Sequence, residues 1–106
     1  MGGREYLGEF EQVVLLALTR LREPAYGAEI HREILARTGR DVSIPSVYVT
    51  LKRMERKALV ASEVVRPAEG GRATRNYRVL PGGREALAQS RELLEQLWDG
   101  LEGERA

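Results

Sequence analysis

The sequence contains no cysteine and only one histidine, and both shortages narrow the chemistry open to it. Without cysteine there is no disulfide framework, thiol nucleophile, zinc finger or iron–sulfur site. A single histidine removes most histidine-based metal sites, so we expect neither a metal nor a cofactor. Carboxylates are plentiful, but they lie at ordinary helix spacings without a nucleophilic partner. The sequence therefore argues against an enzyme.

Long apolar runs are also missing. The longest, Val13 to Leu18, is far shorter than the ~20 residues that span a bilayer. The first residues, Met1 to Glu5, lack the pattern of a signal peptide. We therefore expect a soluble cytoplasmic protein without a membrane partner. The length of 106 residues predicts a single domain with one small core.

A strong overall charge is missing as well, because 17 basic and 16 acidic residues give a formal net charge of +1. The charges are nevertheless unevenly placed. Residues 37–78 carry ten basic and four acidic groups, whereas the stretches before and after them are net negative. The middle of the chain is therefore a candidate surface for a polyanion such as DNA. The competing interpretation is an ordinary solvated surface.

Hydrophobic periodicity predicts four helices, which we expect over residues 9–21, 26–38, about 43–57, and from 84 to about 100 or 103. The first helix is apolar around nearly its whole circumference. Such a helix must be covered on two sides, and a small domain offers only one core. We expect another subunit to supply the second cover.

The third helix has two unlike faces. Its predicted buried stripe comprises Ile44, Val47, Leu51, Met54 and Ala58. The opposite face and its flanks comprise Ser46, Tyr48, Val49, Thr50, Lys52, Arg53, Arg56 and Lys57. Small side chains near the start and cations further along are typical of a helix that lies in a DNA major groove. We expect the first four near base edges or backbone and the cations near phosphates; the alternative is a solvated amphipathic helix.

Two strand-like segments, 59–66 and 73–80, bracket a turn with adjacent glycines and predict a β-hairpin. Arginines are concentrated on and beside it. Arg75 and Arg78 have opposite strand parity, so they cannot both face one side. We expect Gly71, Arg72 and Arg75 to reach DNA, and Tyr77 to lie in the core.

The last helix carries an apolar stripe that a small domain has no room to bury. Another subunit is the natural cover. The predicted dimer interface comprises Phe10 and Val14 of the first helix with Leu94, Leu97, Trp98 and Leu101 of the last.

This order of elements predicts a mainly α fold with a two-stranded β-wing, that is, a winged helix-turn-helix. We expect the DNA-binding domain over residues 7–80 and a C-terminal dimerisation helix over 81–103. In this architecture the third helix enters the major groove of double-stranded DNA and the hairpin, or wing, touches the flanking backbone. Two alternatives stay open: a protein-interaction module built on the same fold, and a protein that binds DNA without sequence preference.

Several linked segments resemble the PadR family of transcriptional regulators. They are Leu7–Glu11 with Val14–Leu18, Ala25–Ile30, Ser46–Glu55 with Leu59–Val60, Gly70–Arg72 with Tyr77, and Gly83–Leu87. The resemblance covers about residues 7–90 in unbroken order and fits the short branch with one C-terminal helix. It implies a homodimeric DNA-binding repressor whose two third helices read the halves of a dyad operator.

The resemblance also gives Trp98 a second interpretation. In multidrug-sensing relatives, an aromatic pair on the C-terminal helices stacks planar ligands at the dimer interface, and Trp98 is similarly placed. Trp98 is therefore the candidate contact for a small-molecule inducer. The alternative is a tryptophan that simply fills the dimer core.

Two positions depart from the family pattern. Ala58 stands where the family usually has glycine, which costs on the order of 1 kcal/mol if the backbone there is left-handed. Leu80 and Pro81 stand where a threonine usually precedes the final helix. We therefore expect Gly82 or Gly83 to serve as a weak N-cap.

Overall fold

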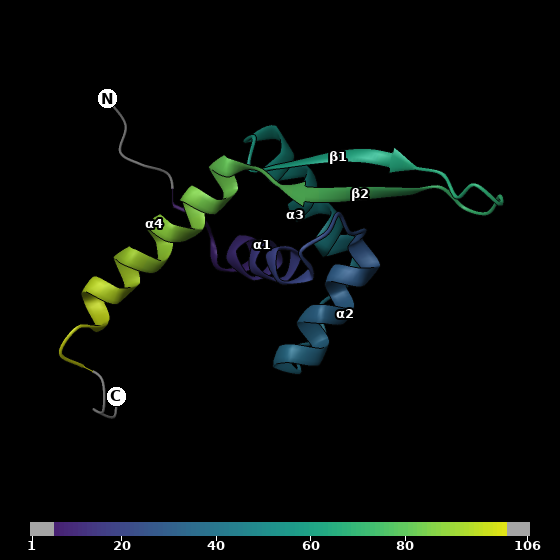
Figure 1. Cartoon of the computed structure of the whole chain (residues 1–106). Helices are drawn as coiled ribbons and strands as arrows, with labels where there is room; N and C mark the ends of the chain where they lie inside the picture. The colour runs from purple at the N-terminus through teal and green to yellow at the C-terminus, as the bar shows by residue number, and fades with distance from the viewer. Residues whose placement is uncertain (1–5, 102–106) are drawn as a thin grey trace.

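The structure is a computed structural model, and it describes residues 6–101. Its elements in chain order are α1 (Glu9–Leu21), α2 (Gly27–Thr38), α3 (Ile44–Arg56), β1 (Val60–Val65), β2 (Thr74–Val79) and α4 (Pro81–Trp98). Helices α1, α2 and α3 pack together, while the hairpin extends away on one side and α4 on the other (Figure 1). The expected mainly α fold with a two-stranded wing is confirmed.

Local hydrogen bonds and backbone geometry set the starts of the first three helices and the end of α2. The carboxylate of Glu11 accepts the N–H of Gly8 ahead of α1 at 2.9 Å, and Glu29 accepts the N–H of Tyr26 ahead of α2 at 3.1 Å. Helix α3 begins on Ser43, whose hydroxyl accepts the Ser46 N–H at 3.1 Å. Helix α2 stops at Gly39, which has the left-handed backbone that glycine adopts without strain.

The hydrophobic core lies between the three packed helices and the base of the wing. Of the predicted α3 stripe, Val47, Leu51 and Met54 are fully buried. The two ends of that stripe are not: Ile44 is 40% exposed, and Ala58 is exposed beyond the end of the helix. Tyr77 is 1% exposed, which confirms its place in the core.

The sheet has one feature that the sequence did not predict. Strands β1 and β2 pair antiparallel with Val60 opposite Val79 and Val65 opposite Thr74. Ala25, in the link between α1 and α2, also pairs with Tyr77 through two backbone hydrogen bonds of 2.8 and 3.0 Å. The base of the wing is thereby joined to the helical core.

Helix α4 begins earlier than expected. It starts at Pro81, with Leu80 as the N-cap residue and no side-chain cap, so the predicted start at Arg84 and the predicted glycine cap are wrong. Proline suits the first helical turn because it has no N–H to leave unpaired. The helix ends at Trp98, close to the nearer of the two expected ends; residues 102 and 103 of the expected segment lie outside the described residues. Within residues 6–101, no helix is both long and apolar enough to cross a membrane.

Candidate nucleic-acid interface

The outermost side chains of α3 form a short ridge. Val49 is 61% exposed, and Lys52 and Arg56 follow it on successive turns of the same exposed face. Between residues 6 and 101, neither cation has a hydrogen bond or ion pair. We call Val49, Lys52 and Arg56 the α3 ridge. Its composition, one apolar side chain and two cations, suits contact with a groove lined by phosphates.

Ser46 and Tyr48 lie beside the ridge but are already engaged within the chain. The Ser46 hydroxyl donates to the Ser43 carbonyl oxygen at 2.7 Å. The Tyr48 hydroxyl accepts the N–H of Gly27 at 3.2 Å, which satisfies one of the free donors at the start of α2. The Tyr48 ring occupies the space where a Cβ on Gly27 would lie, so this position has no room for a side chain. Tyr48 thus fastens α2 to α3.

Thr50 does not belong to this surface. It is only 3% exposed and lies on the buried side of α3. The expectation that Thr50 lies near DNA is therefore wrong. It followed from placing a polar residue on a polar flank, but the helix surface at this position is buried against the rest of the chain.

Arg53 and Lys57 converge on Glu11 of α1. The Glu11 carboxylate is 7% exposed and accepts from Arg53 Nε at 3.1 Å and from Lys57 Nζ at 3.2 Å. Burial raises the pKa of Glu11, but the hydrogen bonds from Gly8, Arg53 and Lys57 outweigh burial and hold that pKa below its ordinary value of 4.5. The sequence alone does not indicate this role for Glu11, because an acidic residue in a first helical turn usually serves only the helix end.

The wing supplies a second group of cations. Gly70 and Gly71 have positive φ angles of 85° and 108°, which bend the chain at the tip next to the exposed Arg72. Arg75 lies further back and donates to the Ser62 hydroxyl at 3.1 Å. That hydroxyl in turn donates to Glu55 of α3 at 2.8 Å, so a polar chain connects the wing with α3.

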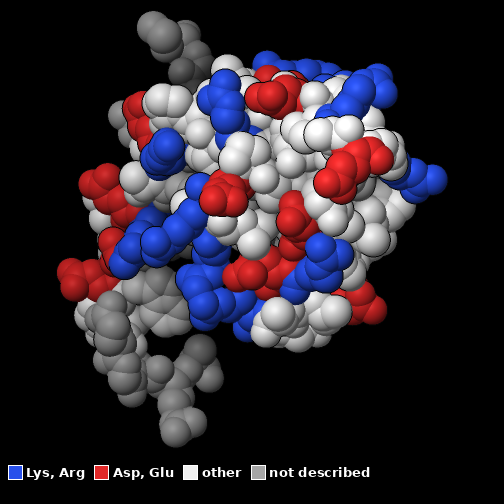
Figure 2. Space-filling view, turned by 45° about the vertical axis from the view of Figure 1, so that its right-hand side comes forward, with Lys and Arg blue, Asp and Glu red and all other residues white. Residues whose placement is uncertain are grey.

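Charge of both signs is interleaved on the surface. Figure 2 shows one face on which groups of lysine and arginine alternate with aspartate and glutamate. The ion pairs account for part of this pattern, for example Arg40 with Glu9 at 2.7 Å and Arg20 with Glu33 at 3.2 Å. On this face the basic groups are therefore interleaved with acidic ones rather than gathered in one continuous patch.

The predicted dimer residues fall into two groups. Val14 is fully buried in the core of its own chain, so its expected place in a dimer interface is wrong. Phe10 is half-buried, and the guanidinium carbon of Arg40 lies 5.5 Å from the centre of its ring. The three predicted residues at the end of α4 and the one just after it are all exposed: Leu94 by 45%, Leu97 by 67%, Trp98 by 57% and Leu101 by 47%.

Helix α1 contributes an apolar residue to the same region. Leu16 is 50% exposed, and the sequence gives no sign of this because the run around it is continuously apolar. An open groove of about 570 Å³ lies between α1 and α4, with Leu16, Leu94 and Trp98 on its walls. Arg91 and Glu95 form an ion pair of 2.9 Å at its edge.

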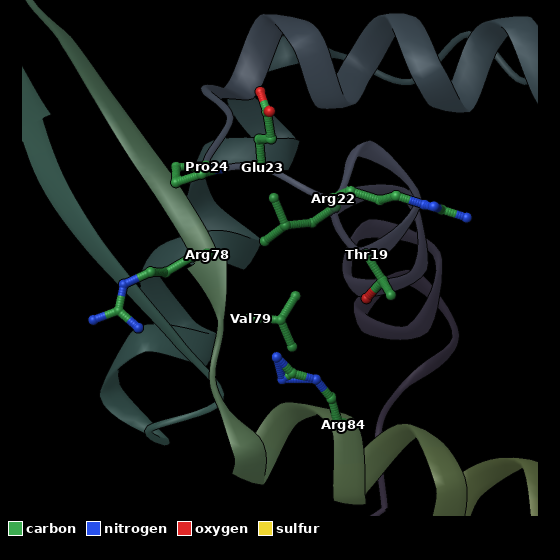
Figure 3. A pocket seen from close by; sticks show the side chains of 8 residues that line it. Thr19, Arg22, Glu23, Pro24, Arg78, Val79 and Arg84 are labelled. Atoms are coloured by element: carbon green, nitrogen blue, oxygen red, sulfur yellow. The ribbon is translucent and has the colours of Figure 1, made fainter.

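A smaller hollow, of about 310 Å³, lies where α1, β2 and α4 meet. Three arginines line it, but Figure 3 shows that they do not converge. Arg84 lies beside Val79, whereas Arg78 turns away across the strand and Arg22 extends across α1 in another direction. The described part of the chain also has no group of three or more histidine, aspartate or glutamate residues placed to hold a metal ion.

A family model described as the transcriptional regulator PadR-like family matches residues 14–89 of this sequence. The chain belongs to the PadR-like family. PadR-like regulators are DNA-binding proteins rather than enzymes, and the resemblance noted in the sequence is thereby confirmed.

Individual relatives and solved structures agree with this assignment. The chain is 43% identical over 72 residues to the transcriptional regulator Rv3488 of Mycobacterium tuberculosis, a match that covers 68% of this chain and less than two thirds, 64%, of that protein. A PadR family regulator from Clostridium difficile R20291 superposes with a TM-score of 0.71 at 22% identity, covering 91% of this chain and all of that one. F93 from STIV, a winged-helix DNA-binding protein, reaches 0.69 at 15% identity over 88% of this chain and 95% of its own. These two superpositions establish the winged-helix fold.

Proposed function

We propose that this PadR-like protein is a transcriptional repressor that binds a specific inverted-repeat operator as a homodimer. The observation that carries the proposal is the α3 ridge, in which an exposed Val49 is followed on successive turns by the uncommitted cations Lys52 and Arg56. Val49 suits contact with a thymine methyl group, and the cations suit phosphates. The wing adds Arg72, beside Gly71, and Arg75 as backbone contacts.

The two engaged residues beside the ridge take supporting roles in this proposal. Tyr48 holds the start of α2 against α3, and Ser46 holds the start of α3. Both side chains are half-buried and border the ridge, so they lie near the DNA backbone rather than at base edges. Affinity should fall steeply with salt, by about 0.9 in log K per log salt for each phosphate contacted.

The proposed dimer rests on the exposed apolar residues of α4 together with Leu16 of α1. Four large apolar side chains at and just after the end of α4, each 45–67% exposed, are unfavourable in water and favour a second copy of the chain as cover. Two-fold symmetry would place the two α3 helices against half-sites about 10 bp apart, one turn of the DNA.

We also propose that a planar small molecule can release the operator by binding beside Trp98. The groove between α1 and α4 gives such a ligand a place, and a ligand that binds one dimer geometry better would change the half-site spacing. Titration of planar cationic dyes against the fluorescence of Trp98 tests this. Saturable quenching supports the ligand site, and its absence for every dye leaves Trp98 as a packing residue.

The central experiment is selection of bound fragments from a random-sequence DNA library at physiological salt. An enriched inverted repeat would support the proposed regulator and give its operator. Retention that is salt-sensitive but yields no motif would favour DNA binding without sequence preference. No retention at all would favour a protein-interaction module.

Two arginine substitutions test which face binds DNA. Arg53→Ala should weaken binding to the selected operator more than Arg91→Ala does, because Arg53 lies next to the α3 ridge and Arg91 lies on α4, paired with Glu95. Fluorescence anisotropy with labelled operator measures both dissociation constants. Equal effects would contradict the proposed DNA face.

A further inference from the structure

Glu11 accepts hydrogen bonds from three residues although it lies in α1 and not on the α3 ridge. Its Oε1 accepts the Gly8 N–H at 2.9 Å, and its Oε2 accepts from both Arg53 and Lys57. With only 7% of the side chain exposed, the carboxylate has little water to replace a lost donor. Removing one partner from a buried charge is costly, so Glu11 strongly favours keeping both cations in place.

Arg53 is bound to Glu11 by one edge only. The hydrogen bond uses Nε, at 3.1 Å, and the two terminal NH₂ groups have no hydrogen-bond partner among residues 6–101. A guanidinium is planar, so fixing Nε also limits the directions in which the terminal groups can point. The side chain is 47% exposed, which leaves those groups open to an incoming ligand. Glu11 thus fixes the Nε edge of the Arg53 guanidinium, while the two terminal NH₂ groups are open to an acceptor. We call these two terminal NH₂ groups the Arg53 fork.

We propose that Glu11 is a positioning residue for operator recognition, because it holds the Arg53 guanidinium so that its two terminal NH₂ groups face one acceptor pair on the DNA. This inference rests on the proposed function. Arg53 keeps its bond to Glu11 when DNA binds and reaches the DNA from its existing place. A held fork discriminates between acceptor geometries, whereas a freely rotating arginine supplies mainly charge.

Charge and positioning predict different results when Glu11 is neutralised. Glu11→Gln removes a negative charge near DNA, which should raise the affinity for every sequence alike. Loss of positioning should lower the affinity for the operator alone. The ratio of operator affinity to random-sequence affinity therefore separates the two effects, whereas either affinity by itself does not.

The experiment measures that ratio for the wild type, Glu11→Gln, Arg53→Ala and the double variant at one salt concentration. Glutamine retains an oxygen for the Gly8 N–H. We expect Glu11→Gln to lower the ratio about five- to tenfold, within the range of one well-placed bidentate contact. In the Arg53→Ala background the same substitution should leave the ratio unchanged, because Glu11 then has no fork to hold.

Glu9→Gln is the matched control. Glu9 also lies in the first turn of α1, but its carboxylate pairs with Arg40 at 2.7 Å rather than with α3. It should leave the ratio unchanged. Arg53→Lys supplies a second variant in case Glu11→Gln fails to fold, since it keeps the charge and removes the fork, and it should lower the ratio to a similar extent.

Three outcomes would overturn the inference. The first is an unchanged ratio in folded Glu11→Gln or, where that variant does not fold, in Arg53→Lys. The second is an equal fall in the ratio with and without Arg53, which would mean that Glu11 acts through the general structure. The third is a wild type without sequence preference, which would overturn the proposed function as well and is seen before any variant is made.

Discussion

The carbonyl group of Leu59 limits which residues can stand where the wing joins α4. Its oxygen accepts the Leu80 N–H at 3.0 Å, and the same oxygen would lie only 2.4 Å from a Cβ placed on Gly83. The Val79 Cγ1 would lie 3.0 Å from that Cβ. The lack of space therefore requires glycine at position 83. Its backbone does not require glycine, because its φ angle is not positive and its conformation is ordinary helix.

Gly83→Ala should lower the free energy of unfolding by about 1–3 kcal/mol, because a backbone carbonyl cannot move aside as a side chain can. Urea unfolding followed by circular dichroism measures the loss. Gly82→Ala is the matched control: its Cβ would lie 3.2 Å from the Ala58 oxygen, so the loss should be smaller. Equal losses at the two positions would contradict the explanation.

Ala58 has a φ of 60°, so the left-handed backbone anticipated at this departure from the family pattern is present. Ala58→Gly should raise the free energy of unfolding by about 0.5–1 kcal/mol, the strain released less the entropy that glycine adds to the unfolded chain. Ala36→Gly, on the exposed side of α2, should have the opposite sign, since glycine weakens a helix interior. Thermal melting of the two variants side by side checks the pair of signs.

At the scale of elements, α1 and α3 are connected by an ion-paired carboxylate as well as by apolar packing. The folded-state pKa of Glu11 is lowered, so its contribution to stability is present above the unfolded value near 4.5 and is lost as the pH falls through the folded value. Glu11→Gln should therefore cost about 1–3 kcal/mol at pH 7 and progressively less in acid. Urea midpoints of wild type and variant from pH 7 to pH 3 test this, and parallel curves would contradict it.

The elements themselves were predictable where punctuation is strong. The range predicted for α1 is the observed one, and α2 and α3 differ by about a residue at their ends, because Pro24, Gly39 and the Ser43 cap mark the boundaries clearly. The start of α4 was missed because two glycines look like a turn in a sequence. In the structure they lie inside a helix whose close approach to Leu59 requires the second of them.

The candidate interface was harder to predict, because helical phase gives the direction of a side chain but not what covers it. Lys52 and Val49 are exposed as phase suggests, whereas Thr50 is covered. Hydrophobic periodicity marks Val14 and Leu16 alike, yet one is buried in the core and the other is 50% exposed. Contacts between distant segments, such as Glu11 with Arg53, leave no local signal in one sequence.

At the scale of the whole molecule, α4 extends away from the three packed helices (Figure 1), and the large apolar side chains of its last turns are exposed. Leu97→Glu should convert the proposed dimer to a monomer, because it places a charge at the most exposed of the apolar positions, 67%. Sedimentation equilibrium gives the mass directly. Gln96→Glu adds the same charge one residue away and should leave the dimer intact; a wild type that sediments as a monomer would contradict the proposed assembly.

The wing is a ladder of paired residues that is attached to the core at its inner end. Its inner rung, Val60 opposite Val79, is anchored by a residue 1% exposed, whereas at the outer end Val64 and Val65 are 48% and 40% exposed. Opening the outer rungs therefore uncovers almost no new apolar surface, and opening the inner ones disrupts the core. Backbone amides should exchange their hydrogens for deuterium fastest near Thr74 and slowest near Tyr77. Slowing at the outer rungs on adding DNA would then mark the wing as the segment that gains order on binding.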